Sequence, residues 1–230
     1  MKNLEVRRGK FSLYVERLEV DSQVVILGRN GSGKSTLLQT LAGFIKPVKG
    51  VITVDGVDVT GLPPRRRNMG YIPQEPVKLP LTPKQALDYF GRVYGRGYMP
   101  ILKELGVDYL VEKRDVAVGE GQLLALALVM LRDPAILLLD EPVSSLDYLN
   151  KLSFWKALKN LRKPALVVTH DPLEAAYIAD VLYVIEEGRL SGPYTNTMRE
   201  MSTEALQTFN LYEKLGNKRN FGKDVDAQGV

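Results

Sequence analysis

The sequence predicts an α/β fold: a mixed, largely parallel sheet, an N-terminal antiparallel β subdomain and an inserted helical subdomain. Residues 24–27 form a continuous apolar run that stops at Gly28 and leads into a helix-like stretch, which is the usual opening of an α/β unit. The short apolar runs 135–139 and 165–168 are typical of strands buried in a parallel sheet. Residues 76–115 show helical spacing and little β signal, so we expect them to interrupt the sheet.

The N-terminal part is expected to be mostly β. Residues 4–6 and 11–15 alternate apolar and polar side chains, as strands do when one face is buried. A helix is predicted from Lys34 to Phe44. Another β stretch covers 51–54 and is followed by the turn signal Asp55-Gly56.

The helical subdomain is expected at about 76–134. Helical spacing is clearest in residues 86–94 and 101–105, and glycines and a proline break the pattern between them. Residues 123–131 are apolar all round, which predicts a helix buried on every side.

A last strand is predicted at 181–185, with a turn at Glu187-Gly188. At 230 residues the chain is long enough for one large domain with its own hydrophobic core. We expect this domain to cover 1–215, and the polar residues 216–230 to form a poorly ordered tail.

Composition excludes several classes of protein. The chain has no cysteine and one histidine, which excludes disulfides, cysteine nucleophiles and histidine-rich metal sites. The net charge of +4 permits anionic ligands but does not indicate a nucleic-acid partner, and Arg65-Arg66-Arg67 is expected to be a solvated turn. No apolar stretch approaches the roughly 18 residues of a spanning helix, and no secretory signal is found, so we expect the protein to stay in a reducing compartment.

Residues 28–36 match the pattern G-x-x-x-x-G-K-[ST], with a predicted strand before it and a predicted helix after it, as the pattern requires. Glycines let backbone N–H groups surround a phosphate chain, and the start of the helix adds its positive end. Lys34 would place a charge on the β and γ phosphates, and Ser35 would offer a hydroxyl to Mg²⁺. The predicted nucleotide-binding residues are Gly28, Arg29, Asn30, Gly31, Ser32, Gly33, Lys34, Ser35 and Thr36.

A second group of residues narrows the chemistry. The apolar run 137–139 ends in two adjacent carboxylates, Asp140 and Glu141. A carboxylate at the end of a strand can hold Mg²⁺, so Asp140 is the predicted metal ligand. Glu141 is the predicted general base that activates water.

Taken in order along the chain, these motifs resemble the ATP-binding-cassette (ABC) ATPase family, whose core is a P-loop NTPase fold, over roughly residues 4–190. The further matching segments are Met69 to Gln74 (Q-loop), Leu139 to Pro142 (Walker B and catalytic glutamate), Ser144 to Asp147 (D-loop) and Val168 to Ala175 (switch-histidine loop). Each motif is short, but five in the family's order are highly specific.

The resemblance implies a role for each of these residues, with ATP and Mg²⁺ as cofactors. Gln74 would contact Mg²⁺ or the attacking water, Glu141 would be the general base, and His170 would contact the γ-phosphate. Asp147 would order the seam of a dimer of cassettes. The family also stacks an aromatic side chain on adenine. Arg8 stands near that position, and Phe11 or Tyr14 is the candidate substitute, although ordinary strand packing also explains both.

The segment 116–122 departs from the family's signature, L-S-G-G-[QE]. Aligned over 116–120, the chain has Ala117 in place of the serine; aligned over 118–122, it has Gly119 there. Both alignments lack the serine hydroxyl that, in the family, bonds the γ-phosphate on the opposite subunit, a charge-assisted bond of about 1.5–3 kcal/mol. The residues expected to face the opposite subunit's ATP are Ala117, Gly119 and Glu120.

The segments 62–67 and 170–175 are most similar to prokaryotic importer ATPases of the molybdate, tungstate and sulfate group. This resemblance implies a peripheral subunit on the cytoplasmic face of the membrane. Its partners would be integral-membrane permease subunits, a solute-binding protein and a second cassette, identical or different. The alternative is a weakly hydrolysing ATP-binding cassette that needs a partner with an intact signature. A nucleic-acid-processing ABC protein is disfavoured, because the chain has no coiled-coil insertion and no second cassette.

Overall fold

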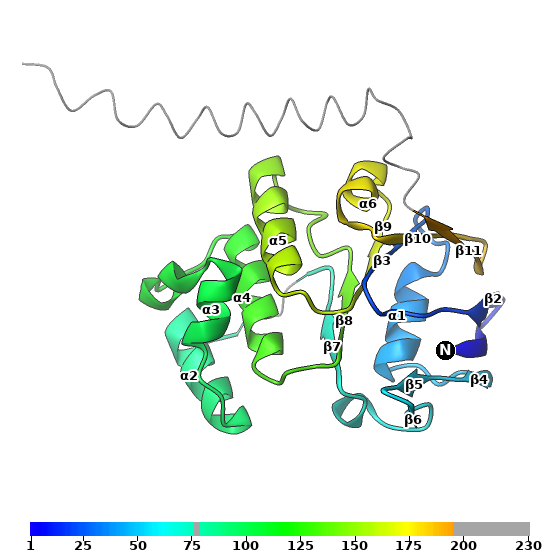
Figure 1. Cartoon of the computed structure of the whole chain (residues 1–230), viewed down its shortest axis with the longest axis horizontal. Coiled ribbons are helices and arrows are strands. Elements are labelled where there is room, and N and C mark those ends of the chain that lie inside the picture. Colours follow the sequence, from blue (N-terminus) through cyan, green and yellow to red (C-terminus); the bar gives the residue numbers. More distant parts are fainter. Residues whose placement is uncertain (76–78, 196–230) are drawn as a thin grey trace, which may run out of the picture.

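The computed structural model describes residues 1–75 and 79–195, so the tail predicted at 216–230 lies outside the described residues. Within them, nine strands form one mixed sheet in the order β4-β1-β2-β11-β10-β3-β9-β8-β7 (Figure 1). The strands are β1 (Lys2–Arg8), β2 (Phe11–Arg17), β3 (Gln23–Leu27), β4 (Lys49–Val51), β7 (Met69–Ile72), β8 (Ile136–Asp140), β9 (Ala165–Thr169), β10 (Val181–Glu186) and β11 (Arg189–Thr195). A separate hairpin pairs β5 (Thr53–Val54) with β6 (Val57–Asp58). The predicted α/β class is confirmed.

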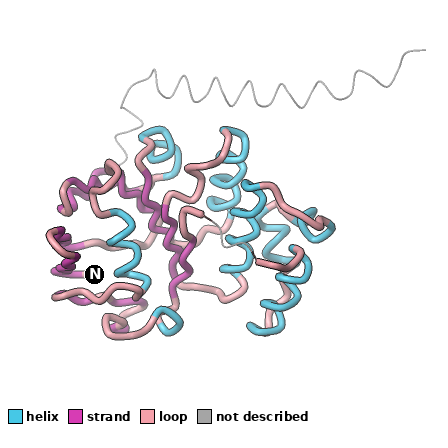
Figure 2. Tube along the Cα trace, turned by 180° about the vertical axis from the view of Figure 1, so that it is seen from behind, coloured by secondary structure: helices cyan, strands magenta, loops and turns pink. Residues whose placement is uncertain are grey.

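The helices divide into those that cover the sheet and those that gather at one end. They are α1 (Lys34–Ala42), α2 (Pro83–Tyr94), α3 (Met99–Leu105), α4 (Val118–Met130), α5 (Tyr148–Asn160) and α6 (Pro172–Ile178), with two short 3-10 helices, η1 (Pro64–Arg66) and η2 (Asp108–Glu112). Figure 1 shows α2, α3 and α4 together at the end opposite β1, β2 and β4, and Figure 2 shows the same separation from behind. The helices α2 to α4 occupy the range in which a helical subdomain is predicted.

The central strands β10, β3, β9, β8 and β7 run parallel, as the buried apolar runs predict, whereas β1 pairs antiparallel with β2 and β4. In this register Leu27 pairs with Thr169, and Val168 pairs with Asp140. Strands β3, β9 and β8 therefore end at the same edge of the sheet. The segments that follow them, which carry most of the predicted chemistry, must meet at that edge.

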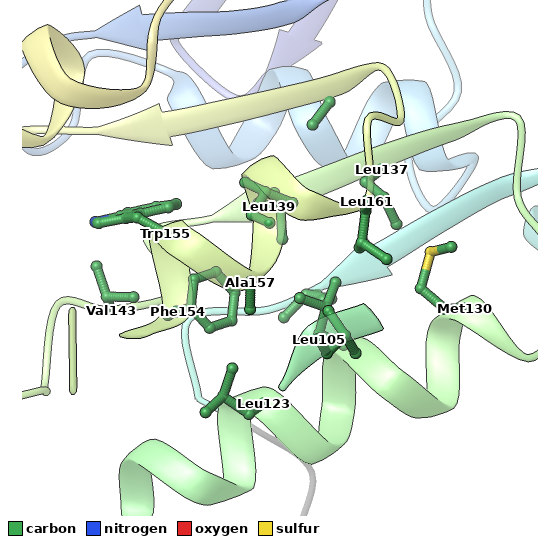
Figure 3. Close-up of a cluster of buried hydrophobic side chains, with 14 of the residues drawn as sticks. Leu105, Leu123, Met130, Leu137, Leu139, Val143, Phe154, Trp155, Ala157 and Leu161 are labelled. Atoms are coloured by element: carbon green, nitrogen blue, oxygen red, sulfur yellow. The ribbon is translucent and has the colours of Figure 1, made fainter. Parts of the chain in front are cut away.

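Alternate side chains of the central strands enter two different hydrophobic cores. Leu137 and Leu139 of β8 pack with Phe154 and Trp155 of α5 and with α4 (Figure 3). Leu138, between them in the sequence, packs on the opposite face with α1. The sheet is thus buried on both faces, which holds its functional edge in a fixed place.

Two expected boundaries in the first part of the chain need correction. The helix predicted to reach Phe44 ends at Ala42, because Gly43 takes a left-handed φ of 91° and closes the last turn. The strand predicted at 51–54 is two short strands interrupted at Ile52. The N–H of Ile52 bonds the hydroxyl of Thr60 at 2.8 Å, so a loop rather than a strand satisfies it.

The helix predicted to be buried on every side is not. It begins at Val118, and Leu123, Leu126, Ala127 and Met130 are buried. The elements that pack against α4 are α2, α3, α5 and β7, and they do not cover its whole circumference. Within the apolar stretch that starts at Leu123, the residues of α4 that stay half-buried are Leu124, Ala125, Leu128 and Val129.

The predicted solvated turn at Arg65-Arg66-Arg67 holds for Arg65 and Arg66 but is wrong for Arg67, whose side chain is 1% exposed. Its guanidinium donates to the backbone carbonyls of Leu62, Thr40, Leu41 and Thr60 at 2.7–2.8 Å. Two of these carbonyls belong to the last turn of α1, where helix carbonyls otherwise lack partners. Arg67 therefore fastens the end of the phosphate-loop helix to the chain that enters β7.

Replacing Arg67 with methionine keeps much of the side-chain volume but leaves these carbonyls without donors. We expect Arg67→Met to lower the free energy of unfolding by about 3 kcal/mol, measured by urea denaturation. Arg66→Met is the matched control, since that side chain is exposed and should change stability by less than about 0.5 kcal/mol. Equal stability of the Arg67→Met variant and the parent would contradict this account.

Candidate active site

A cleft of about 590 Å³ opens at the carboxyl edge of the parallel strands. It brings together residues from the phosphate loop, β8, the loop after β7 and the loop after β9, which are far apart in the sequence. The lining residues are Arg8, Phe11, Asn30, Gly31, Gly33, Lys34, Ser35, Thr36, Gln74, Glu141 and His170. Most residues predicted to bind nucleotide or to act in catalysis thus share one cleft.

The phosphate loop runs from the end of β3 to the start of α1 and has a conformation that needs glycine. Gly33, the residue before the helix, has a φ of 110°, and a Cβ there would lie 2.7 Å from the Phe11 ring. Lys34 is 4% exposed, and its ammonium donates to the carbonyls of Gly28 and Arg29 at 2.8 and 3.1 Å. The loop therefore surrounds its own ammonium group, and the first turn of α1 starts beside it, an arrangement suited to polyphosphate.

Other positions of the loop are held by the sheet. The N–H of Gly28 bonds the carbonyl of Thr169 at 3.2 Å, and the carbonyl of Ser32 accepts the N–H of Gly188 at 3.0 Å. The Ser32 hydroxyl is buried and has no hydrogen-bond partner among the described residues. The predicted residues Gly28, Arg29 and Ser32 thus support the loop rather than line the cleft.

Asp140 ends β8 and is 5% exposed. Its carboxylate accepts the Ser35 hydroxyl at 2.9 Å and the Tyr71 hydroxyl at 3.1 Å. Burial raises the pKa of Asp140 above its ordinary value, even though both hydrogen bonds act against that rise. Burial and the neighbouring Asp140 charge raise the pKa of Tyr71 to about 12, so Tyr71 remains a proton donor at neutral pH.

The pair Ser35 and Asp140 fits a magnesium ion. A hydroxyl oxygen and a carboxylate oxygen stand 2.9 Å apart beside the phosphate loop, and hard oxygen ligands are those that Mg²⁺ prefers. The carboxylate is buried and costly as an anion, so a bound cation would offset that cost. Gln74, the third predicted ligand, lines the cleft together with Ser35, whereas Asp140 lies behind Ser35 and is not among the lining residues.

Glu141 connects two other parts of the cleft. Its carboxylate is 11% exposed and lies 3.0 Å from the Lys34 ammonium and 2.8 Å from Nδ1 of His170. Its backbone has a φ of 45°, which is uncommon outside glycine, and its N–H bonds the carbonyl of Val168 at 3.1 Å. This backbone conformation, held by the hydrogen bond to Val168, directs the carboxylate toward the cleft.

Gln74 follows β7 and touches two further segments. Its side-chain amide donates to the Ser144 hydroxyl at 3.1 Å, and its backbone carbonyl accepts the side-chain amide of Gln122 at 2.9 Å. Gln122 is fully buried on α4. The loop after β7 is therefore joined to α4 and to the segment that precedes α5.

The signature-like segment lies at the start of α4, outside the cleft lining. Ala117 is the N-cap and makes no side-chain cap bond, while Glu120 accepts the N–H of Ala117 at 3.0 Å and pairs with Lys113. A capping box has serine or threonine at the N-cap and glutamate or glutamine three residues later, so this spacing fits the alignment over 116–120. Gly119 adjoins α5, since a Cβ there would lie 2.8 Å from Asn150.

Asp147 caps α5 beside this segment. Its carboxylate accepts the backbone N–H of Asn150 at 3.0 Å, and hydrogen bonds from Asn150 lower the pKa of Asp147. Ala117, Gly119, Glu120 and Asp147 therefore form a separate group at the starts of two adjacent helices. Their predicted role toward a second subunit stays a prediction.

The two aromatic candidates are placed differently. Phe11 lines the cleft with Arg8 and packs over Gly33, whereas Tyr14 is half exposed and is not part of the lining.

Sequence reasoning missed the roles of Tyr71, Ser144 and Gln122. Tyr71 lies within the recognised Q-loop segment, but only the register that pairs it with Leu138 of β8 brings it to Asp140. Ser144 stands in the recognised D-loop segment, and its contact with Gln74 spans 70 positions. Gln122 is a polar residue at the start of an apolar helix, which was a usable signal of a buried hydrogen bond.

Comparison with known proteins identifies clear relatives. The family model described as ABC transporter matches residues 12–144. The molybdate/tungstate import ATP-binding protein WtpC of Archaeoglobus fulgidus is 35% identical over 202 residues, covering 81% of this chain and 82% of that protein. The thiamine import ATP-binding protein ThiQ of Escherichia coli is 35% identical over 201 residues, covering 79% of this chain and 83% of that protein.

Solved structures show the same fold. One, an ATP-binding subunit of an ABC transporter, superposes with a TM-score of 0.73 at 23% identity and covers 94% of this chain and 98% of its own. Another, the ADP conformation of an ATP-binding cassette of an ABC transporter, has a TM-score of 0.74 at 20% identity and covers 90% and 96%. Over residues 1–75 and 79–195, none of the helices combines the length and hydropathy needed to cross a membrane.

Folding raises the pKa of Asp140, so this group stabilises the folded protein only at pH values where it is protonated. At neutral pH it is ionised, and its buried charge destabilises the fold. We therefore expect Asp140→Asn, without nucleotide or magnesium at pH 7, to unfold at a higher temperature than the parent. Differential scanning calorimetry measures this shift in Tm. Asp108→Asn, at an exposed position, should leave Tm unchanged. A lower Tm for Asp140→Asn would mean that the bonds from Ser35 and Tyr71 outweigh the burial of charge.

Proposed function

This chain belongs to the ABC transporter family, and we propose that it is the ATP-hydrolysing subunit of an importer that works with a separate membrane permease. One observation carries the proposal: the Glu141 carboxylate lies 3.0 Å from the Lys34 ammonium and 2.8 Å from Nδ1 of His170, so three segments that are far apart in the sequence meet beside one phosphate loop. A binding module alone requires the loop and its lysine. The carboxylate aligned by a histidine is the feature that adds water activation.

The first step is binding of the triphosphate by the phosphate loop. The backbone N–H groups of the loop and the start of α1 would receive the phosphates, and the Lys34 ammonium would bond their oxygens. Ser35, Asp140 and Gln74 would hold Mg²⁺, which supplies positive charge to the β and γ phosphates when it is bound. Phe11 lines the cleft where the adenine ring would stack.

The second step is the attack of water on the γ-phosphate, in which a new P–O bond forms as the bond to the β–γ bridging oxygen breaks and ADP leaves. Lys34 holds Glu141 at 3.0 Å in the described structure, and a bound phosphate would compete for that ammonium. Glu141 would then accept the proton of the attacking water while His170, 2.8 Å from its other oxygen, keeps the carboxylate in place and contacts the γ-phosphate. Positioning and charge stabilisation account for most of the catalysis in phosphoryl transfer of this kind.

The partners follow from the relatives. Importer ATP-binding subunits act with membrane permeases, so we propose a peripheral location on the cytoplasmic face, beside permease subunits and a solute-binding protein. The similarity to the molybdate/tungstate import protein supports an oxyanion as the transported solute. A second cassette, identical or different, would close the ATP sites through Ala117, Gly119, Glu120 and Asp147. Nucleic acid is not an expected partner.

Glu141→Gln separates hydrolysis from binding. We expect this variant to bind Mg-ATP as the parent does and to hydrolyse it about 10²–10⁴-fold more slowly, because the general base is gone. Lys34→Ala should lose ATP binding itself. Isothermal titration and a phosphate-release assay measure the two quantities, with the exposed Glu104→Gln as a control. Hydrolysis by Glu141→Gln at the parent's rate would exclude the assigned base.

The altered signature supports a second candidate function, that of a cassette that binds ATP but needs a partner with an intact signature for turnover. The observation in its favour is the missing hydroxyl at Ala117, whose helix has no side-chain cap. Binding without hydrolysis by the isolated chain, restored by mixing with a second cassette, would support this candidate. Rapid turnover by the purified chain alone would exclude it.

Ala117→Ser restores the missing hydroxyl. We expect the free energy of unfolding to rise by about 1 kcal/mol, because serine caps the first turn of α4. If two copies form the ATP site, kcat should also rise by about tenfold, the value of one charge-assisted hydrogen bond. A stability gain without a change in kcat would place this residue outside the ATP site. The exposed Val118→Ser is the neighbouring control for stability.

A further inference from the structure

A second buried carboxylate adjoins the candidate active site and has no part in the mechanism above. Glu174 of α6 is 6% exposed. Its Oε2 accepts the hydroxyl of Thr169 at 2.7 Å, and its Oε1 accepts the ammonium of Lys151 at 2.7 Å. Both oxygens are engaged inside the fold, where an unpaired charge would be costly.

The Thr169 hydroxyl extends this anchor to the residue on the other side of His170. It donates to Glu174 and accepts the backbone N–H of Asp171 at 3.0 Å. Lys151 adds a second link, because its Nζ lies 3.7 Å from the Asp171 carboxylate. The residues immediately before and after His170 are therefore both tied to the pair formed by Glu174 and Lys151.

His170 itself depends on this backbone for its place. Its side chain is 49% exposed, so packing does not enclose the ring, yet Nδ1 lies 2.8 Å from Glu141. An exposed ring keeps such a contact only if its Cα is held still. The anchor also reaches α5 through Lys151, which follows Asp147 by one helical turn.

We infer that Glu174 is a positioning residue for ATP hydrolysis: it fixes the backbone on both sides of His170 through Thr169, Asp171 and Lys151, and so holds His170 against Glu141. The inference rests on the proposed ATPase function. Glu174 does not line the cleft, so it acts through His170 and not on the nucleotide.

Thr169→Val tests the inference by removing the hydroxyl while keeping the shape of the side chain. We expect kcat to fall about tenfold or more and KM for ATP to change much less, since His170 holds the general base Glu141 while the phosphate loop supplies most of the contacts to the nucleotide. Thr169→Ser keeps the hydroxyl and should restore kcat. Glu174→Leu breaks the same hydrogen bond, so its effect on kcat should not multiply with that of Thr169→Val.

Thr60→Val is a matched control. The Thr60 hydroxyl also donates to a carboxylate, Asp58 at 2.6 Å, and also accepts a backbone N–H, that of Ile52 at 2.8 Å. It belongs to the loop around the hairpin β5–β6 and not to the cleft. Thr60→Val should therefore lose stability without a change in kcat, which separates positioning from general loss of structure.

A second readout does not depend on hydrolysis. His170 is the only histidine of the chain, so its Cε1–Hε1 group gives a single imidazole resonance in a proton–carbon NMR spectrum. Glu141→Gln defines the resonance of the ring without its carboxylate partner. We expect Thr169→Val to move the resonance toward that position, and Thr169→Ser and Thr60→Val to leave it at the parent's.

The outcomes separate this inference from the proposed function. If the parent does not hydrolyse ATP but the resonance moves as stated, the ATPase proposal fails and the anchoring of His170 stands. If the parent hydrolyses ATP and Thr169→Val keeps both kcat and the resonance, Glu174 is not a positioning residue. An equal fall in kcat for Thr60→Val would likewise overturn the inference.

Discussion

The structure depends on the parallel register that ends β3, β9 and β8 at one edge of the sheet. Leu27 is level with Thr169, and Val168 is level with Asp140, so the phosphate loop, His170 and the acidic pair follow the strands side by side at this edge. Parallel strands need long crossover connections, and these connections place the three segments far apart in the sequence. Both faces of the sheet are packed with apolar side chains, so the edge keeps its geometry.

At this edge, two buried charged groups differ in how their charge is compensated. Lys34, nearly buried, satisfies its three donors with two loop carbonyls and the Glu141 carboxylate. Asp140, equally buried, accepts hydrogen bonds only from the neutral hydroxyls of Ser35 and Tyr71. Burial raises its pKa, although both hydrogen bonds oppose that rise. The site therefore has one anion already matched to a cation and another that is not. A cation at Asp140 would compensate the unmatched charge, and an anionic ligand would compete with Glu141 for Lys34. A magnesium–triphosphate complex would bring both charges.

The residues predicted to face a second subunit are organised differently. Ala117 and Asp147 begin two adjacent helices, and Gly119 brings those helices close at Asn150. This group lies apart from the cleft, yet it is joined to it through Gln74, whose amide reaches Ser144 and whose carbonyl reaches Gln122. These two hydrogen bonds therefore connect the loop after β7, which lines the cleft, with α4 and with the segment before α5. The missing serine hydroxyl affects this group and leaves the cleft itself complete.

The sequence by itself determined the phosphate loop, the acidic pair after β8, the histidine that follows β9 and the parallel strands, because each of these depends on residues close together in the chain. Local pattern was also enough to recognise the family. Only the tertiary structure decided which residues support them: Tyr71 at Asp140, Arg67 at the end of α1, and Glu174 behind His170. These contacts join segments through burial and strand register. A polar residue buried by the fold and the same residue on a solvated turn have the same local sequence pattern, which is why Arg67 was assigned to the surface from sequence.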